Sequence, residues 1–303
     1  MDIIFDIIVV GCGPAGMAAA LYATRSGKKV LILEKETIGG QMALAPKVEN
    51  YLSIESISGA SLADKMFEQI CSLGVEFELE NVESIEKIDD MFYISTDYSK
   101  HVSKSVIIAT GAHHKKIGIP NEDKFLGNGL SYCALCDGAF YKGEEVAVIG
   151  DGNTALQYAL DLSNYCKKVV VCTLFDKFFG DSVLVDRLET RENIEVLTNV
   201  ELVNMHGEDE VKTLHFYDTQ TGLDATIDVK GVFIAIGQEP NNDIVKNLTK
   251  LDDKGYIIAS EDLVTDTPGL FVAGDCRTKS TRQISTAVAD GAIAALAAVK
   301  YLG

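Results

Sequence analysis

The chain has 303 residues, of which 47% are hydrophobic and 24% are charged. This length fits two domains of ordinary size, each with a hydrophobic core. The formal net charge of −18, without a basic stripe, argues against nucleic acid as a partner. Because the apolar runs are short and lie beside glycines, we expect no membrane-spanning segment and no membrane partner.

The amino-terminal segment MDIIFDIIVV has no basic leader and passes directly into a predicted strand. We therefore expect a cytoplasmic protein without a signal peptide. The chain has seven cysteines, and an odd, scattered number is not typical of a structural disulfide framework. Only Cys133 and Cys136 are closely spaced, and the other cysteines are interpreted mostly as small core residues.

A strand, a glycine turn, a helix and a second strand are predicted at the start of the chain. Residues 3–10 form an almost continuous apolar run that is typical of a buried strand. The helix is expected to run to about Arg25, and the second strand covers 28–34. The turn between the first strand and the helix consists of Gly11, Cys12, Gly13, Pro14, Ala15 and Gly16.

This glycine turn has the features of a dinucleotide-binding loop. Its backbone N–H groups can approach a pyrophosphate, whose charge the helix N-terminus favours. Pro14 suits the first helical position, where its missing N–H group costs nothing. Glu34 lies eighteen residues after Gly16, where a carboxylate accepts hydrogen bonds from ribose hydroxyls. The alternative is a tight turn without a ligand, but strand, loop, helix and acid together indicate a nucleotide site.

The same pattern recurs later and predicts a second dinucleotide-binding fold. A strand over 145–149 precedes a glycine turn over 150–155, a helix over 156–165 and a strand over 167–173. The two copies align without a gap. The sequence therefore predicts an α/β fold with two Rossmann-like dinucleotide-binding domains.

The second copy is expected to be inserted into the first domain. Short strands over 75–111 precede it, and a strand near 270–275 and an Ala-rich helix from Ile284 follow it. The predicted boundaries give a discontinuous first domain of 1–115 and 239–303 and an inserted domain of 116–238. No further carboxy-terminal domain is expected.

The second glycine loop lacks the side chains that anchor a nicotinamide dinucleotide. Thr173 takes the place of Glu34, and Asp151 lies within the loop itself. A carboxylate there would repel a phosphate by about 1–4 kcal/mol at partly solvated dielectric. Apart from Lys177, nothing in 173–179 suits a 2′-phosphate. The open alternative is that nicotinamide still binds through other contacts, because backbone N–H groups do much of the binding.

Cys133 and Cys136 form a CxxC pair just before the inserted domain's first predicted strand. Two such cysteines can close a small disulfide that exchanges readily with other thiols. Asp137 can act as an acid or a base for the thiolates when the disulfide opens. A zinc site would need a second pair of ligands, and His113 and His114 point to opposite faces if their segment is extended.

Taken together, these motifs resemble the low-molecular-weight thioredoxin reductases over essentially the whole chain. The resemblance implies FAD as cofactor, thioredoxin as partner and a homodimer in which the inserted domain rotates. It implies that Cys136 lies nearer the flavin ring, that Cys133 attacks the partner disulfide, that Asp137 handles the proton and that Asp275 holds the ribityl chain. The FAD-binding residues that it implies are Gly11, Gly13, Pro14, Ala15, Gly16, Glu34, Lys35, Gly40, Gln41, Asn50, Ala109, Thr110, Gly111, Gly274, Asp275, Arg282, Gln283 and Ile284.

The resemblance fails at the nicotinamide site. The family's His-Arg-Arg…Arg cluster aligns with Thr173, Leu174, Phe175 and Phe179, and none of the four matches. In this respect the chain looks more like the ferredoxin-dependent flavin thioredoxin reductases, so reduced ferredoxin is predicted as the electron donor.

Two alternatives stay open at this point. The first is a thioredoxin reductase that uses NADPH or NADH, which the glycines of the second loop favour. The second is a non-catalytic flavin-binding redox sensor, against which the CxxC-Asp sequence argues. The charge counts against ferredoxin, because ferredoxins are usually acidic and so is this chain. Docking would need a local basic patch, for which the candidates are Lys115 with Lys116, Lys167 with Lys168, and Arg187 with Arg191.

Overall fold

The computed structural model describes residues 3–303, which form two compact units. The split unit runs to His113 and resumes at Glu239, and the inserted unit is His114–Gln238. The first crossing therefore lies two residues before the predicted one, and the second lies where the sequence placed it. The connecting strands β7 (Ala112–His114) and β16 (Gln238–Pro240) pair with each other in a two-stranded sheet.

The split unit is built on a seven-stranded sheet with the order β3-β2-β1-β6-β5-β4, in which β17 also pairs with β6. β1 pairs in parallel with β2 and β6, whereas β5 pairs with β4 and β6 in antiparallel fashion. The strands are β1 (Ile4–Val10), β2 (Val30–Glu34), β3 (Glu76–Leu79), β4 (Val82–Ile88), β5 (Met91–Thr96), β6 (Lys100–Ile108) and β17 (Leu270–Val272).

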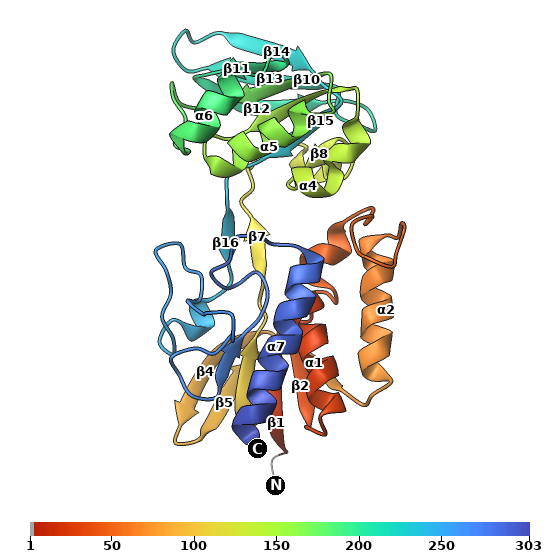
Figure 1. The fold of residues 1–303 in the computed structure, drawn as a ribbon, viewed down its shortest axis with the longest axis vertical. Helices are drawn as coiled ribbons and strands as arrows, with labels where there is room; N and C mark the ends of the chain where they lie inside the picture. The colour runs from red at the N-terminus through yellow and green to blue at the C-terminus, as the bar shows by residue number, and fades with distance from the viewer. Residues whose placement is uncertain (1–2) are drawn as a thin grey trace. The chain divides into compact units, whose positions relative to one another are not determined.

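Three helices lie side by side in the split unit (Figure 1). They are α1 (Pro14–Arg25), α2 (Gly59–Cys71) and α7 (Ile284–Leu302), with the short helices η1 (Gly40–Leu44) and η3 (Asp243–Val245) in the connections. Successive residues of a strand face opposite sides of the sheet, so alternate residues of β1 enter two separate cores. Ile7 and Val9 join the core with these helices, and Ile8 and Val10 join the core with β5.

Helix α7 corrects one expectation from the sequence. By length and composition its 19 residues are apolar enough to cross a membrane, which the sequence analysis had excluded for every segment. One side of the helix packs against α1, where a Cβ atom on Gly291 would lie 2.2 Å from the carbonyl oxygen of Ala15. The same side buries Asp290 in an ion pair with Arg277. These contacts make α7 a core helix of the split unit.

The inserted unit has a parallel sheet with the order β11-β10-β9-β15-β8 and an antiparallel sheet of β12-β13-β14. Alternate residues of β9 again separate two cores, because Val146 and Val148 pack with α5 whereas Ala147 and Ile149 pack with β12 and β13. The parallel strands are β8 (Leu130–Ser131), β9 (Glu145–Ile149), β10 (Lys168–Cys172), β11 (Ile194–Leu197) and β15 (Gly231–Ile234). The antiparallel strands are β12 (Val200–His206), β13 (Thr213–Asp218) and β14 (Asp224–Asp228).

The helices of the inserted unit are α3 (Glu122–Phe125), α4 (Ala134–Asp137), η2 (Gly138–Tyr141), α5 (Asn153–Ser163) and α6 (Ser182–Glu189). Each unit thus contains a parallel strand, a glycine turn, a helix and a second parallel strand. The predicted α/β fold with one such domain inserted into the other is confirmed.

Candidate active site

The first glycine loop connects β1 to α1 in a conformation that requires glycine. Gly11 has a φ of 108°, and a Cβ atom on it would lie 2.3 Å from the carbonyl oxygen of Ala109. Gly13 is open, because no atom lies within 4 Å of the position that its Cβ atom would take. Pro14 is the first residue of α1. The loop therefore exposes backbone at the start of a helix, as a pyrophosphate site requires.

Glu34 lies at the end of β2, directly beside this loop. Its Oε2 atom accepts a 2.8 Å hydrogen bond from the N–H group of Cys12. Its Oε1 atom accepts hydrogen bonds from the N–H groups of Lys35 and Glu36 at 2.9 and 3.0 Å. Each carboxylate oxygen can accept more than one hydrogen bond, so Glu34 can still receive ribose hydroxyls.

A cavity of about 500 Å³ opens next to Glu34 within the split unit. Gly11, Glu34, Lys35 and Thr110, four of the residues predicted to bind FAD, line it. No motif marked several of the other residues that line it, which are Asn81, Val82, Pro240, Asn241, Asn242 and Lys254, and His113 was considered only as a possible zinc ligand. A space of this size suits the nucleoside part of a dinucleotide.

Gly274 and Asp275 follow β17 and approach α1 closely. A Cβ atom on Gly274 would lie 2.8 Å from the Cβ atom of Ala15, so these residues lie beside the glycine loop. Burial raises the pKa of Asp275, and the charges of Lys279 and Arg282 oppose that rise. Within residues 3–303 the Oδ1 atom of Asp275 is buried without a hydrogen-bond partner. A ligand hydroxyl would satisfy it, because buried polar atoms are almost always hydrogen-bonded.

A charged cluster holds the segment that carries Asp275. Asp290 accepts two hydrogen bonds from the Arg277 guanidinium, at 2.9 and 3.0 Å, and one from Lys279 at 2.9 Å. Its carboxylate also accepts the N–H group of Gly274 at 3.1 Å. Burial alone would raise the pKa of Asp290, but these cations leave it below its ordinary value of 3.8.

The other predicted FAD-binding residues lie around the same loop. Gly39 donates its N–H group to the Cys12 carbonyl oxygen, which brings the turn before Gln41 to the glycine loop. A Cβ atom on the next residue, Gly40, would lie 3.6 Å from the Cα atom of Gly13.

The remaining predicted residues come from other segments of the split unit. Asn50 donates its side-chain amide to Gln283 at 3.1 Å. The structure also places Gly16 in α1, Gly111 before β7, Arg282 against Tyr256, and Ile284 at the start of α7.

These observations support FAD as the ligand of the split unit. The open glycine loop suits a pyrophosphate, Glu34 suits a ribose, and the Asp275 oxygen that has no hydrogen-bond partner suits the ribityl hydroxyls. All of these groups belong to the split unit. The fold brings together residues that lie far apart in the sequence, because the carboxyl ends of β1, β2, β6 and β17 share one edge of the sheet.

The second glycine loop has a similar backbone but different surroundings. Gly150 has a φ of 148°, and Gly152 is open as Gly13 is. Thr173, in the place of Glu34, is only 1% exposed, and its hydroxyl accepts the N–H group of Phe175. A buried threonine of this kind cannot replace the ribose-binding carboxylate.

The segment after Thr173 packs onto this second loop. Phe179 donates its N–H group to the Asp151 carbonyl oxygen at 2.8 Å. Asp181 donates its N–H group to the side chain of Asn153 at 2.6 Å, and its carboxylate accepts the Asn153 amide at 3.1 Å. Asn153 is the first residue of α5. A second carboxylate, which the sequence analysis did not single out, thus joins Asp151 where a pyrophosphate would bind.

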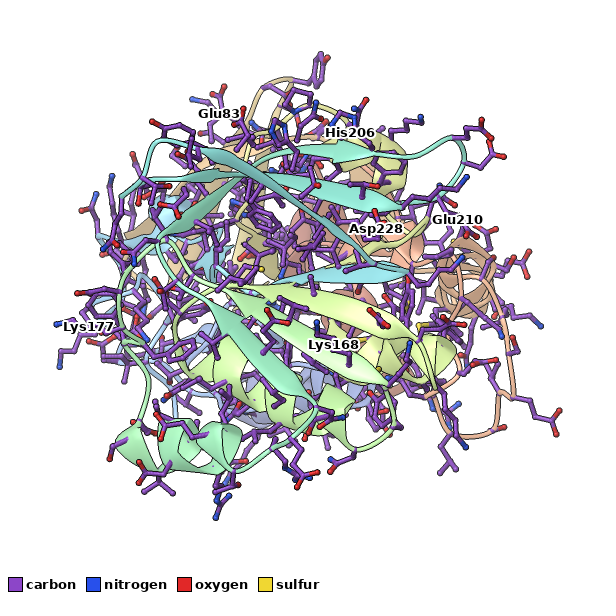
Figure 2. All side chains as sticks on the ribbon, turned by 90° about the horizontal axis from the view of Figure 1, so that it is seen from above. Glu83, Lys168, Lys177, His206, Glu210 and Asp228 are labelled. Carbon is purple, nitrogen blue, oxygen red and sulfur yellow. A yellow bond between two sulfur atoms is a disulfide. The ribbon has the colours of Figure 1, made fainter. Side chains whose placement is uncertain are left out.

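Lys177 is the one cation of this segment. It lies at the periphery of the inserted unit in Figure 2, and its ammonium group lies 5.5 Å from the centre of the Phe179 ring. Phe175 and Phe179 meet edge to face, and both are substantially exposed. Aromatic surface therefore occupies the region where a 2′-phosphate would need arginines.

The CxxC pair forms a disulfide in the inserted unit. Cys133 and Cys136 are joined across the first turn of α4, with their Cα atoms 5.3 Å apart. The N–H group of Cys136 donates to the Cys133 sulfur at 3.2 Å, which would stabilise a thiolate on Cys133. Cys136 is exposed. Within residues 3–303, no group of three or more His, Cys, Asp or Glu could hold a metal ion.

Asp137 is the last residue of α4, directly after Cys136, and is half-buried. Burial raises its pKa, whereas a hydrogen bond from Ser131 opposes the rise. A carboxyl group with a raised pKa can both give and take protons nearer neutral pH. Ser131 is a functional candidate that no sequence signal marked, because a serine before a CxxC pair carries no motif of its own.

Comparison with known proteins shows the family to which the chain belongs. The sequence profile of the pyridine nucleotide-disulphide oxidoreductases matches residues 5–291. Thioredoxin reductase of Bacillus subtilis is 38% identical over 300 residues, which cover 99% of this chain and 95% of that protein. A "34.2 kDa protein in rubredoxin operon" of Clostridium pasteurianum is 38% identical over 299 residues, 98% of this chain and 97% of that protein.

Solved structures show the same likeness. The crystal structure of thioredoxin reductase from Streptococcus pyogenes matches with a TM-score of 0.96 at 37% identity, covering 100% of this chain and 99% of that one. The fold and the site therefore define a pyridine nucleotide-disulphide oxidoreductase. Within this class the chain belongs to the low-molecular-weight thioredoxin reductase family, and FAD is its cofactor.

Proposed function

We propose that this protein reduces the disulfide of a thioredoxin through FAD and the Cys133–Cys136 pair, and that reduced ferredoxin is its electron donor. The observation that carries the proposal is the contrast between the two nucleotide loops. The first has an open backbone, a carboxylate suited to a ribose and, beside it, an Asp275 oxygen without a hydrogen-bond partner. The second has Thr173 in place of the acid and two carboxylates at the start of α5.

The dithiol chemistry follows from the groups around the disulfide. FAD, when bound and reduced by two electrons from the donor, would supply the electron pair that opens the Cys133–Cys136 bond, and two protons complete the dithiol. Asp137 is positioned to deliver one of these protons and to take one back. The hydrogen bond from the Cys136 N–H group favours the thiolate on Cys133 as the attacking sulfur.

The partner is then reduced by thiol–disulfide exchange. The Cys133 thiolate attacks one sulfur of the thioredoxin disulfide, forms a mixed disulfide and releases the other partner sulfur as a thiolate. Cys136 next attacks Cys133, which restores the Cys133–Cys136 bond and frees the second partner sulfur. Two electrons and two protons pass to thioredoxin, and the enzyme returns to its disulfide form.

The donor assignment is tested by anaerobic reduction of the flavin. We expect reduced ferredoxin to bleach the flavin absorbance within seconds and to drive reduction of a thioredoxin disulfide. NADPH and NADH at micromolar levels should bleach it far more slowly, because the second loop repels a pyrophosphate and lacks a ribose or 2′-phosphate anchor. The measurement is stopped-flow absorbance in the flavin band, with dithionite as the control that shows the flavin to be reducible.

Three results separate the alternatives. Rapid bleaching by NADPH or NADH would reject the ferredoxin proposal in favour of an ordinary thioredoxin reductase, the function for which several relatives are named. Flavin that is reduced without any thioredoxin turnover would favour the redox-sensor alternative. Protein that cannot be loaded with FAD would overturn the site itself.

The homodimer and the cytoplasmic location expected from the sequence stay predictions. Exposed apolar side chains on α7 and α1 are consistent with a second copy at that face, namely Ile293 at 39%, Leu296 at 51% and Tyr22 at 41% exposure. Sedimentation velocity tests the dimer. A monomer at micromolar concentration would contradict it.

A further inference from the structure

Ser131 connects the acid of the redox site to the backbone of its first cysteine. It is the last residue of β8, and Phe233 of β15 is its partner in the parallel sheet. Its side chain is only 4% exposed. Strand pairing and burial therefore fix its position, and an ordered hydroxyl in such a place must find partners.

The Ser131 hydroxyl has three partners within reach. It donates to the Oδ2 atom of Asp137 at 2.6 Å and accepts the N–H group of Cys133 at 3.0 Å. The carbonyl oxygen of Cys133 is a second acceptor, at 3.4 Å. A hydroxyl has one proton to donate and two lone pairs, so it can turn between two acceptors while it keeps the Cys133 N–H group.

This arrangement can serve both protonation states of Asp137. The ionised carboxylate receives the hydroxyl proton of Ser131. The protonated carboxyl can donate to the Ser131 oxygen instead, and the hydroxyl then turns to the Cys133 carbonyl oxygen. In both states the carboxyl stays hydrogen-bonded to the same buried atom. The Asp137 carboxyl can therefore keep its position when it gains or loses a proton.

Two phenols lie near enough to Asp137 for its charge to act on them, and both are neutral near neutral pH. Burial is the larger cause, and the charge of Asp137 adds to it, in raising the pKa of Tyr158 of α5 and of Tyr141 of η2. The pKa of Tyr141 rises to about 12, with a further contribution from Glu210. Tyr158 donates its hydroxyl to the Tyr132 carbonyl oxygen. The pair Cys133–Cys136 carries no charge as a disulfide. No described charged group acts on the pKa of Asp137 more than the Ser131 hydrogen bond does.

We propose that Ser131 is a positioning residue for the dithiol chemistry, because its hydroxyl holds the Asp137 carboxyl in both protonation states and ties it to the Cys133 backbone. The inference rests on the proposed function, in which Asp137 exchanges a proton with the cysteine sulfurs. Ser131 itself neither forms nor breaks a bond to sulfur. Removal of the Ser131 hydroxyl should therefore shift the pH at which Asp137 titrates, in addition to any effect on the stability of the inserted unit.

The experiment compares Ser131→Ala, Ser131→Val and Ser131→Thr in the FAD-loaded, full-length protein. Infrared difference spectra follow the carboxyl band of Asp137 with pH, and Asp137→Asn identifies that band. Because the hydroxyl favours the ionised carboxylate, its loss in the Ala and Val variants should raise the titration midpoint by about one pH unit. The Thr variant keeps the hydroxyl and should titrate like the unchanged protein. Thr and Val have the same shape, so this pair controls for packing if the Ala variant does not fold.

A kinetic readout accompanies the titration. Protein reduced chemically with dithionite is freed of reductant and mixed with thioredoxin disulfide across a pH series. We expect the Ala and Val variants to react about tenfold more slowly near neutral pH, with the Asp137-dependent limb of the pH profile moved upward. In Asp137→Asn the same Ser131 changes should have little further effect, because the two residues act as a unit.

Two results would overturn the inference. One is an Asp137 titration that is unchanged in both Ser131→Ala and Ser131→Val. The other is a Ser131→Ala penalty that is just as large in the Asp137→Asn background. Failure of the unchanged protein to reduce thioredoxin would instead reject the proposed function, and the infrared titration would still decide the link between Ser131 and Asp137.

Discussion

Cys136→Ser should lower thioredoxin reduction by at least about a thousandfold, because without its resolving sulfur the enzyme cannot release the partner. Cys133 keeps its thiol in this variant and can still attack the thioredoxin disulfide. The product should be a stable mixed disulfide, which is visible as a covalent complex by non-reducing electrophoresis and by intact mass. The FAD content should be unchanged, since both cysteines belong to the inserted unit and the residues that suit FAD belong to the split unit.

Two control variants sharpen this prediction. Cys133→Ser should lose activity to a similar extent but should trap no complex, because the attacking sulfur is absent. Cys71→Ser removes an exposed cysteine at the end of α2 and should keep full activity. If Cys133→Ser trapped the complex with thioredoxin and Cys136→Ser did not, the roles of the two sulfurs would be the reverse of those proposed. Unchanged turnover in both variants would remove the dithiol from the mechanism.

Asp290→Asn should destabilise the protein by about 3–5 kcal/mol, the usual cost of removing one partner from a buried ion pair. Asp290 is 7% exposed, and it neutralises Arg277 and Lys279, which are equally buried. Without its charge Arg277 loses this carboxylate partner, and Lys279 keeps only the carboxylate of Asp275, 3.9 Å away. We expect a lower melting temperature, read by circular dichroism, and loss of FAD during purification. Asp253→Asn, at an exposed position of the same unit, is the matched control.

The same cluster predicts a pH dependence of stability. The pKa of Asp290 is lowered in the folded protein, so the stability that its charge contributes is fully present above its unfolded value of about 3.9. That contribution is lost as the pH falls through the lower, folded value. The stability advantage of the unchanged protein over Asp290→Asn should therefore shrink below about pH 4. If the unchanged protein kept its full stability advantage over Asp290→Asn well below about pH 4, the lowered pKa of Asp290 would be contradicted.

The sequence predicted most of the backbone organisation, because the signals for it are local. The apolar run before Gly11 predicted β1, and Pro14 predicted the start of α1. The repeat of strand, glycine turn and helix predicted a second copy of the fold. The prediction that no segment is long and apolar enough to span a membrane was wrong for α7, whose length and composition meet that requirement. Its buried Asp290 and its Gly291 contact with α1 explain the composition without a membrane.

The site was predictable where a motif carried it and not elsewhere. Glu34 and the CxxC pair follow from spacing. The structure places Glu34 beside the first glycine loop and joins the two cysteines in a disulfide, and their roles stay predictions. Asn242 shows the opposite case. It is 3% exposed, accepts the Thr110 hydroxyl and lines the cavity beside Glu34, yet nothing around it in the sequence marks it. Its partners come from segments far away in the chain.

The sequence by itself predicted the two nucleotide folds, the CxxC pair and a second loop without the carboxylate that follows the first, because glycine turns, acid spacing and CxxC are short-range patterns. Only the tertiary structure decided that Asp181 joins Asp151 at the second loop, that Asp290 holds the Asp275 segment and that Ser131 reaches Asp137. Each of these contacts depends on strand order and helix packing. Such contacts form between residues whose separation along the chain carries no information about their distance in space.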